Sequence, residues 1–123
     1  MTEIAVFTPD PADPSYAGQW PTVLERLSQA LAREGITAAP TPWTDHVEDA
    51  SGLLAYALVL PVVSWGYHRD HARWVQGCET WTAAGVRLAN PASVLRWNSD
   101  KTYLGRLAER GIAIPPTLWR TDV

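Results

Sequence analysis

Short apolar runs alternate with stretches of helical spacing along the first third of the chain. Residues 3–8, Glu-Ile-Ala-Val-Phe-Thr, are apolar at their centre and predict a buried strand, which the proline-rich segment after them ends. Apolar residues then recur every three or four positions over 20–31, with Pro21 in the first turn and Gly35 after the last, and this spacing predicts a helix. Residues 36–42 leave no room for a hairpin, so we expect them to return parallel to the first strand.

The second third of the chain opens with its most hydrophobic segment. Residues 53–63 are almost unbroken apolar sequence, which is typical of a strand covered on both faces. A helical face can be traced from His68 to Trp81 and ends at Gly85. Residues 86–89 then predict a short strand, which completes a second βαβ crossover.

Shorter elements are predicted for the last third. Asn90-Pro91 interrupts the chain before a short turn over 92–96. Asn98 is expected to cap a helix that runs to Arg110. Residues 112–114, Ile-Ala-Ile, predict a final short strand.

This alternation of strands and helices without hairpin signals predicts an α/β fold, a three-layer sandwich with a mainly parallel, Rossmann-like sheet. We expect this domain to occupy residues 1–116. Pro-Pro-Thr-Leu-Trp-Arg follows the last predicted strand, so residues 117–123 are expected to begin a linker toward another domain.

Composition and charge exclude several classes of function. The 123 residues are 46% hydrophobic, enough for a core without disulfides or a structural metal. The formal net charge of -3 argues against a nucleic-acid binder that works by counterion release. No apolar run approaches the roughly 18 residues of a membrane helix, and Glu3 stands where a signal peptide carries basic residues. The lone Cys78 forms no internal disulfide, so we expect a reducing, cytoplasmic location.

The loops after the strands hold the candidate binding residues, because ligands of open α/β sheets bind beyond the carboxyl ends of the strands. The segment 64–68 follows the most apolar strand and combines a hydroxyl, two aromatic rings, a glycine and an imidazole. We therefore predict that Trp65, Tyr67 and His68 contact substrate. The first loop, residues 10–19, carries two carboxylates and a tyrosine that can hold a polar ligand; a surface loop with helix-capping carboxylates is the alternative.

For two further groups of side chains, a metal site and a reactive thiol are the less favoured alternatives. His68 and His71 are spaced to share a metal ion, but no third ligand has a fixed spacing from them, so a hydrogen-bonded or exposed pair is favoured. Cys78 lies on the same helical face as Trp74 and Trp81, which predicts an inert core thiol.

Lys101 is the one lysine among ten basic residues. It closes the segment Trp97-Asn98-Ser99-Asp100-Lys101 at a predicted helix start, where free main-chain N–H groups and the helix dipole favour an anion such as phosphate. A solvated lysine beside a capping asparagine is the alternative. The sequence has no G-x-G-x-x-G, P-loop or G-x-S-x-G motif, so nicotinamide-binding, P-loop and serine-hydrolase functions lack their machinery.

Residues 85–104 and 111–117 resemble the end of the pre-ATP-grasp domain of ATP-grasp ligases. The features in common are Asn-Pro, a short Leu-Arg turn, an acidic-Lys pair that opens a helix, and Gly-Ile-x-x-Pro-x-Thr. Among these ligases the segment is most similar to the glutathione synthetase and ribosomal-protein glutamate ligase branch.

The resemblance implies the N-terminal, substrate-side domain of an ATP-dependent carboxylate-amine ligase. Such enzymes phosphorylate a carboxylate with Mg-ATP, and an amine then attacks the acyl phosphate to give an amide and ADP. It also implies that Lys101 reaches the nucleotide phosphates, with Asp100 as its partner or as part of the helix start. ATP and Mg²⁺ are the implied cofactors, with Mg²⁺ ligands outside this segment. The usual Asn-Glu-Lys is here Asn-Ser-Asp-Lys, so no nucleotide role is carried over to Asn98 and glutathione synthesis is not implied.

The lobes that grasp ATP lie downstream in these ligases, so we expect this segment to be inactive alone and to belong to a larger enzyme. The partners would be small-molecule or peptide carboxylate and amine substrates and a downstream ATP-grasp domain, with a homodimer left open. A bare domain interface predicts exposed apolar side chains at Trp97, Leu118 and Trp119. The alternative is a free-standing α/β ligand-binding or dimerisation module without catalytic activity.

Overall fold

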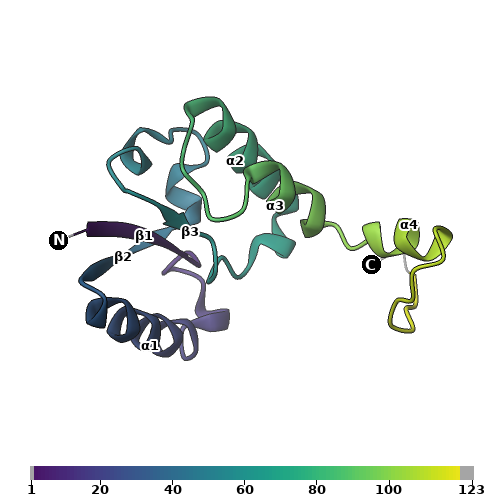
Figure 1. Ribbon diagram of the computed structural model, residues 1–123, viewed down its shortest axis with the longest axis horizontal. Coiled ribbons are helices and arrows are strands. Elements are labelled where there is room, and N and C mark those ends of the chain that lie inside the picture. Colours follow the sequence, from purple (N-terminus) through teal and green to yellow (C-terminus); the bar gives the residue numbers. More distant parts are fainter. Residues whose placement is uncertain (1, 120–123) are drawn as a thin grey trace.

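A small parallel sheet forms the centre of the computed structural model, which describes residues 2–119. Its strand order is β2-β1-β3 (Figure 1). β1 (Thr2–Thr8) pairs along its whole length with β2 (Ile36–Pro42), and through Ala5 and Val6 with β3 (Val59–Leu60). The predicted α/β fold with a parallel sheet is confirmed.

Helices cover both faces of the sheet. α1 (Trp20–Arg33) lies on one face, and α2 (His71–Ala84) and α3 (Ala92–Ser99) lie on the other (Figure 1). Because side chains alternate along a strand, Val6 packs with Leu24 of α1 while Phe7 packs with the α2 side. The first βαβ unit therefore forms where the hydrophobic pattern places it.

No helix within residues 2–119 is both long and apolar enough to span a bilayer. The two longest, α1 and α2, have 14 residues each.

The long strand predicted over residues 53–63 is wrong, since only Val59 and Leu60 are strand. A 3₁₀ turn, Ser51–Leu53, buries Leu53 before the strand begins, whereas Leu54 and Val62 are more than half exposed. Pro61 has no N–H to continue the ladder. The apolar run is therefore divided between a turn, a very short strand and a loop.

The predicted strand over residues 86–89 is reduced to one parallel bridge, between Val59 and Leu88. The N–H of Val59 donates to the carbonyl of Arg87 at 2.8 Å, and the N–H of Ala89 donates to the carbonyl of Val59 at 2.9 Å. The direction of the segment is as predicted, but its pairing is too short to make a strand.

Two short helices replace the predicted turn and the helix expected from Asn98 to Arg110. α3 already contains Asn98, so the capping role predicted for it is wrong. The helix ends because the Asp100 carboxylate accepts the N–H of Thr102 at 2.9 Å, a local bond that competes with helical pairing. α4 (Tyr103–Glu109) follows and lies away from the sheet (Figure 1).

The strand predicted over residues 112–114 is also wrong. The segment 112–119 is irregular and lies beside α4, away from the edge of the sheet (Figure 1), so it has no strand to pair with. Trp97, Leu118 and Trp119 are exposed, at 50%, 95% and 52%, as expected. Of the predicted linker, residues 120–123 lie outside the described residues.

The core on the α2 side is built from aromatic rings. Phe7 packs on Trp81 with ring centres 4.8 Å apart, and Trp81 contacts Trp74, which contacts Trp43. The Trp81 indole N–H donates to the carbonyl of His46 at 2.9 Å, so this buried polar atom also ties the loop after β2 to α2. The cluster thus joins the sheet, α2 and one of the strand-end loops.

We expect Trp81→Ala to lower the free energy of unfolding by about 3–5 kcal/mol, because it leaves a cavity in this cluster. Trp81→Phe keeps a ring but removes the bond to His46, and a loss of about 1–2 kcal/mol is expected. Urea unfolding followed by circular dichroism measures both. Trp97→Ala, at a half-exposed position, is the control and should cost less than about 1 kcal/mol. Equal losses for Trp81→Ala and Trp97→Ala would contradict this account of the core.

Candidate ligand site at the strand ends

Three loops converge at the carboxyl edge of the sheet. They follow β1, β2 and β3, and together they surround a hollow of about 240 Å³. The residues that line it are Asp10, Asp13, Trp43, Thr44, Trp65, Gly66, Arg69 and Asp70. This is where an open parallel sheet places its ligands.

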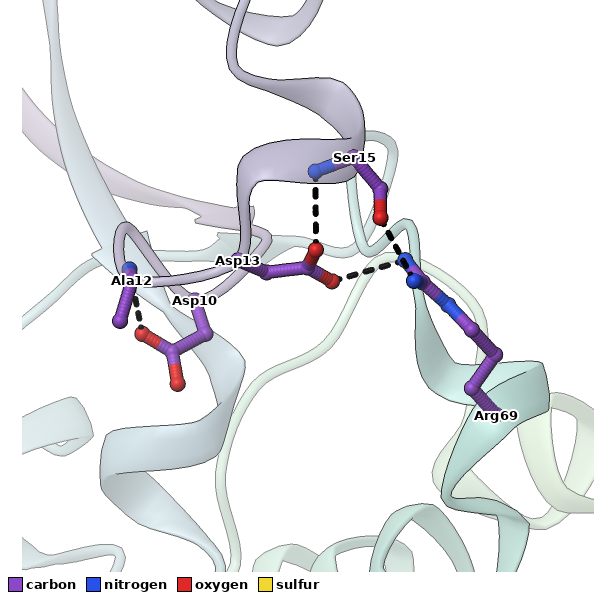
Figure 2. A network of polar contacts seen from close by, with 5 residues as sticks. All are labelled: Asp10, Ala12, Asp13, Ser15 and Arg69. Atoms are coloured by element: carbon purple, nitrogen blue, oxygen red, sulfur yellow. Dashed lines mark hydrogen bonds and ion pairs between the residues drawn. The ribbon is translucent and has the colours of Figure 1, made fainter.

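An ion pair joins the first of these loops to the third. Arg69 donates through Nη2 to Oδ2 of Asp13 and through Nη1 to Oγ of Ser15, both at 2.7 Å (Figure 2). The other Asp13 oxygen accepts the N–H of Ser15 at 2.9 Å, as Figure 2 shows. Arg69 therefore holds a loop more than 50 residues away in the sequence.

These contacts also set the charge of Asp13. The main-chain N–H and the hydroxyl of Ser15, together with Arg69, hold the pKa of the Asp13 carboxyl below its ordinary value. Asp10, in the same loop, accepts the N–H of Ala12 at 2.9 Å through one oxygen (Figure 2). Two carboxylates thus stand at one end of the hollow, one of them neutralised by Arg69.

Ring contacts extend the link between the first and the third loop. The Arg69 guanidinium lies 5.1 Å from the ring centre of Tyr16, and Tyr16 meets Trp65 edge-on with ring centres 5.6 Å apart. Gly66, the residue after Trp65, has φ +93°, a left-handed conformation that glycine adopts without strain. A Cβ built on it would lie 3.6 Å from Oδ2 of Asp13, an ordinary van der Waals distance, so the backbone conformation and not the space favours glycine here.

The second loop is fixed to α2 by another arginine. Arg73 pairs with Glu48 and donates to the carbonyl of Thr44 at 2.9 Å. The hydrogen bond from Arg73 lowers the pKa of the Glu48 carboxyl. Trp43 is 2% exposed, and among residues 2–119 neither its indole N–H nor the Thr44 hydroxyl has a hydrogen-bond partner. Both residues line the hollow, but these two polar atoms are themselves buried.

The three predicted substrate contacts lie together beside this hollow. Trp65 lines it and also a second one of about 270 Å³, which Tyr67 and His68 line with Tyr16 and Gln19. Tyr67 also packs on Trp74 of the core with ring centres 5.0 Å apart, whereas His68 is exposed. The Trp65-Gly66 segment separates the two hollows.

Lys101 lies elsewhere, at the joint between α3 and α4. It is exposed, its Nζ donates to the carbonyl of Asn98 at 3.1 Å, and it lies 5.7 Å from the ring centre of Tyr103. Lys101 lines neither strand-end hollow, so the predicted site residues form one group of three and one separate lysine.

Sequence reasoning missed four residues that line the hollow: Trp43, Thr44, Arg69 and Asp70. The rule that ligands bind after parallel strands pointed to these loops. It could not select Trp43 or Arg69, because their roles depend on contacts with residues far along the chain.

His71 is hydrogen-bonded, with its Nε2 2.9 Å from Oγ of Ser99, and His68 is exposed, as expected. Within residues 2–119 the structure contains no cluster of three possible metal ligands. Cys78 is 2% exposed, and burial raises the pKa of its thiol to about 11, which keeps the thiol in its less reactive protonated form.

Because the pKa of Asp13 is lower in the folded state, its contribution to stability is complete above the ordinary value of 3.8 and is lost as the pH falls through the folded value. We therefore expect Asp13→Asn to flatten the loss of stability as the pH falls below the ordinary value of 3.8. Urea unfolding at a series of pH values measures this slope. Superimposable pH profiles for the two proteins would contradict the assigned contacts.

The chain is similar to a known protein family, to a known protein and to a solved structure. The model of the N-terminal domain of D-cycloserine synthetase DcsG matches residues 4–90. The cycloserine biosynthesis protein DcsG of Streptomyces lavendulae is 33% identical over 91 residues, which are 74% of this chain and 29% of that protein. A crystal structure of D-cycloserine synthetase DcsG matches with a TM-score of 0.70 and 27% identity, covering 93% of this chain and 35% of that one.

The chain spans about a third of the length of these relatives. The family match begins in β1, ends after the bridge at Leu88, and includes every residue that lines the two strand-end hollows. The chain belongs to the family of D-cycloserine synthetase DcsG N-terminal domains.

Proposed function

We propose that this chain is the N-terminal, substrate-side domain of an ATP-dependent carboxylate-amine ligase of the ATP-grasp type, and that the strand-end hollow binds its small-molecule substrate. The observation that carries the proposal is the family match, which covers all three loops around the hollow. The relatives are named for the synthesis of D-cycloserine, so a small substrate derived from an amino acid is the class we propose.

The chemistry of the hollow supports a substrate of this size. Its volume, about 240 Å³, is below the roughly 300–1,000 Å³ typical of drug-sized ligands. Asp10 and Asp70 offer carboxylate oxygens to an ammonium or amide group of the substrate, while Trp43 and Trp65 supply apolar walls. Asp70 precedes α2 but makes no capping hydrogen bond with its side chain, which leaves its carboxylate available to a ligand.

Lys101 is proposed to contact the nucleotide phosphates. Its ammonium group is exposed and donates to the main-chain carbonyl of Asn98, while the Asp100 carboxylate accepts the N–H of Thr102. Lys101 can therefore reach an anion without first breaking an ion pair with Asp100. When bound, Mg-ATP supplies the phosphoryl group that activates a carboxylate. The part of Lys101 is then to neutralise charge on the phosphates through its Nζ. We propose that the Mg²⁺ ligands belong to another part of the ligase and that this domain alone is inactive.

The glutathione synthetase and ribosomal-protein glutamate ligase branch stays a prediction. The residues that suggested it, 85–117, lie almost entirely beyond the family match. A cytoplasmic location and a homodimer are likewise predictions.

A free-standing ligand-binding or dimerisation module is the second candidate. The exposure of Trp97 and Leu118 favours it as much as it favours a missing neighbouring domain, because either one would cover these side chains. Release of ADP by the protein that carries this domain distinguishes the ligase from the module.

In that ligase, Lys101→Ala should raise the KM for ATP or lower kcat at least tenfold, about 1.4 kcal/mol.

Asp70→Asn should instead raise the KM for the small substrate, since it alters the hollow and leaves Lys101 intact. Steady-state ADP release, with each substrate varied in turn, measures both. Unchanged kinetics in Lys101→Ala would remove Lys101 from the nucleotide site, and an unchanged substrate KM in Asp70→Asn would remove Asp70 from the substrate site.

A further inference from the structure

A hydrogen bond joins the first residue of α2 to the last residue of α3. Nε2 of His71 lies 2.9 Å from Oγ of Ser99, and the Ser99 hydroxyl donates to the carbonyl of Arg96 at 2.8 Å. A serine hydroxyl has a single proton. Since that proton is used on Arg96, the imidazole must be the donor, and His71 carries a proton on Nε2.

This bond lies at the point where the chain leaves α3. Asp100, the next residue, has an extended backbone, and Lys101 follows it before α4 begins. The pKa of the Asp100 carboxyl is lowered, mainly by the N–H of Thr102 and in smaller part by the nearby charges of His71 and Arg106. His71 therefore faces the joint that carries Lys101 through its hydrogen bond to Ser99.

His71 is also directly connected to the candidate ligand site. It follows Arg69, which holds the first loop, and Asp70, which lines the hollow. A second polar tie between α2 and α3, the ion pair of Arg96 with Glu79 at 3.0 Å, lies later in α2 and earlier in α3 than this hydrogen bond. In the segment 69–71, Arg69 thus contacts the first loop, Asp70 lines the hollow and His71 contacts the joint between α3 and α4.

We propose that His71 is a positioning residue that fixes, through Ser99, where the chain leaves α3 and hence where Lys101 lies relative to the ligand hollow. This rests on the phosphate-binding role proposed for Lys101. The hydrogen bond of His71 ties the end of α3 to the start of α2, next to the ligand hollow, whereas α4 itself lies away from the sheet (Figure 1).

Nuclear magnetic resonance of the 123-residue chain tests the positioning directly. At pH 8, the imidazole nitrogen shifts of His71 should show the proton on Nε2. His71→Ala should speed exchange of the Thr102 and Leu104 amides, which are bonded to Asp100 and Lys101, by about tenfold. His71→Gln, which keeps an N–H donor at similar reach, should restore slow exchange. The control Glu79→Gln loosens α3 without touching the joint and should leave residues 100–104 unchanged. A proton on Nδ1, or the same exchange rates in His71→Ala as in the control, would overturn the proposal.

Kinetics of the ligase separate this proposal from the function on which it rests. His71→Ala should raise the KM for ATP about threefold to tenfold, His71→Gln should recover most of the loss, and Ser99→Ala should match His71→Ala without adding to it. An unchanged KM in His71→Ala while Lys101→Ala is impaired would refute the positioning role alone. No effect of Lys101→Ala would refute the proposed function, and the exchange experiment would then still decide whether His71 holds the joint.

Discussion

The central position of β1 is the constraint on which the rest of the structure depends. Residues Ile4 to Pro9 are all buried, because β1 has a strand on each side and a helical layer on each face. A strand in this position accepts only parallel neighbours whose connections run through helices on opposite faces. All three strands then end at the same edge, and the loops that follow them meet there. The hollow is a consequence of this topology, and the side chains of the loops decide what it can bind.

Arg69 and Arg73 hold together the loops that form the site. Arg69 holds the first loop through Asp13 and Ser15, and Arg73 holds the second through Glu48 and Thr44. Both ion pairs are partly exposed, and exposed pairs contribute little to global stability, typically about 0–1 kcal/mol. Their importance is local: Arg69 orders the first loop, in which none of residues 10–19 is buried, whereas the second loop is also held by its buried residues Trp43, Val47 and Ala50. The aromatic core beneath, from Phe7 through Trp81 and Trp74 to Trp43, supplies the rigid base.

The elements with a clear local pattern could be predicted from the sequence, and those that depend on competition between local bonds could not. β1, α1 and β2 occur where apolar spacing, Pro21 and Gly35 place them. The run 53–63 was misread as one strand because apolarity does not distinguish a strand from a buried turn. Asn98 was misread as a cap because the Asp100 side chain, two residues later, captures the N–H of Thr102 and ends α3 there. The topology rule led to Trp65, Tyr67 and His68 beside the hollow, but Arg69 was missed because its partners lie more than 50 residues away.

The measurement that tests this account most directly is amide hydrogen exchange of the first loop in Arg69→Gln and in Arg73→Gln. The central claim is that Arg69 holds the loop after β1 in place to complete the ligand hollow. It predicts that the Ser15 amide, bonded to Asp13, exchanges about tenfold faster in Arg69→Gln and at the native rate in Arg73→Gln, while core amides of β1 stay protected in both. Equal exchange of the Ser15 amide in the two variants would contradict the claim, because the first loop would then be ordered without Arg69.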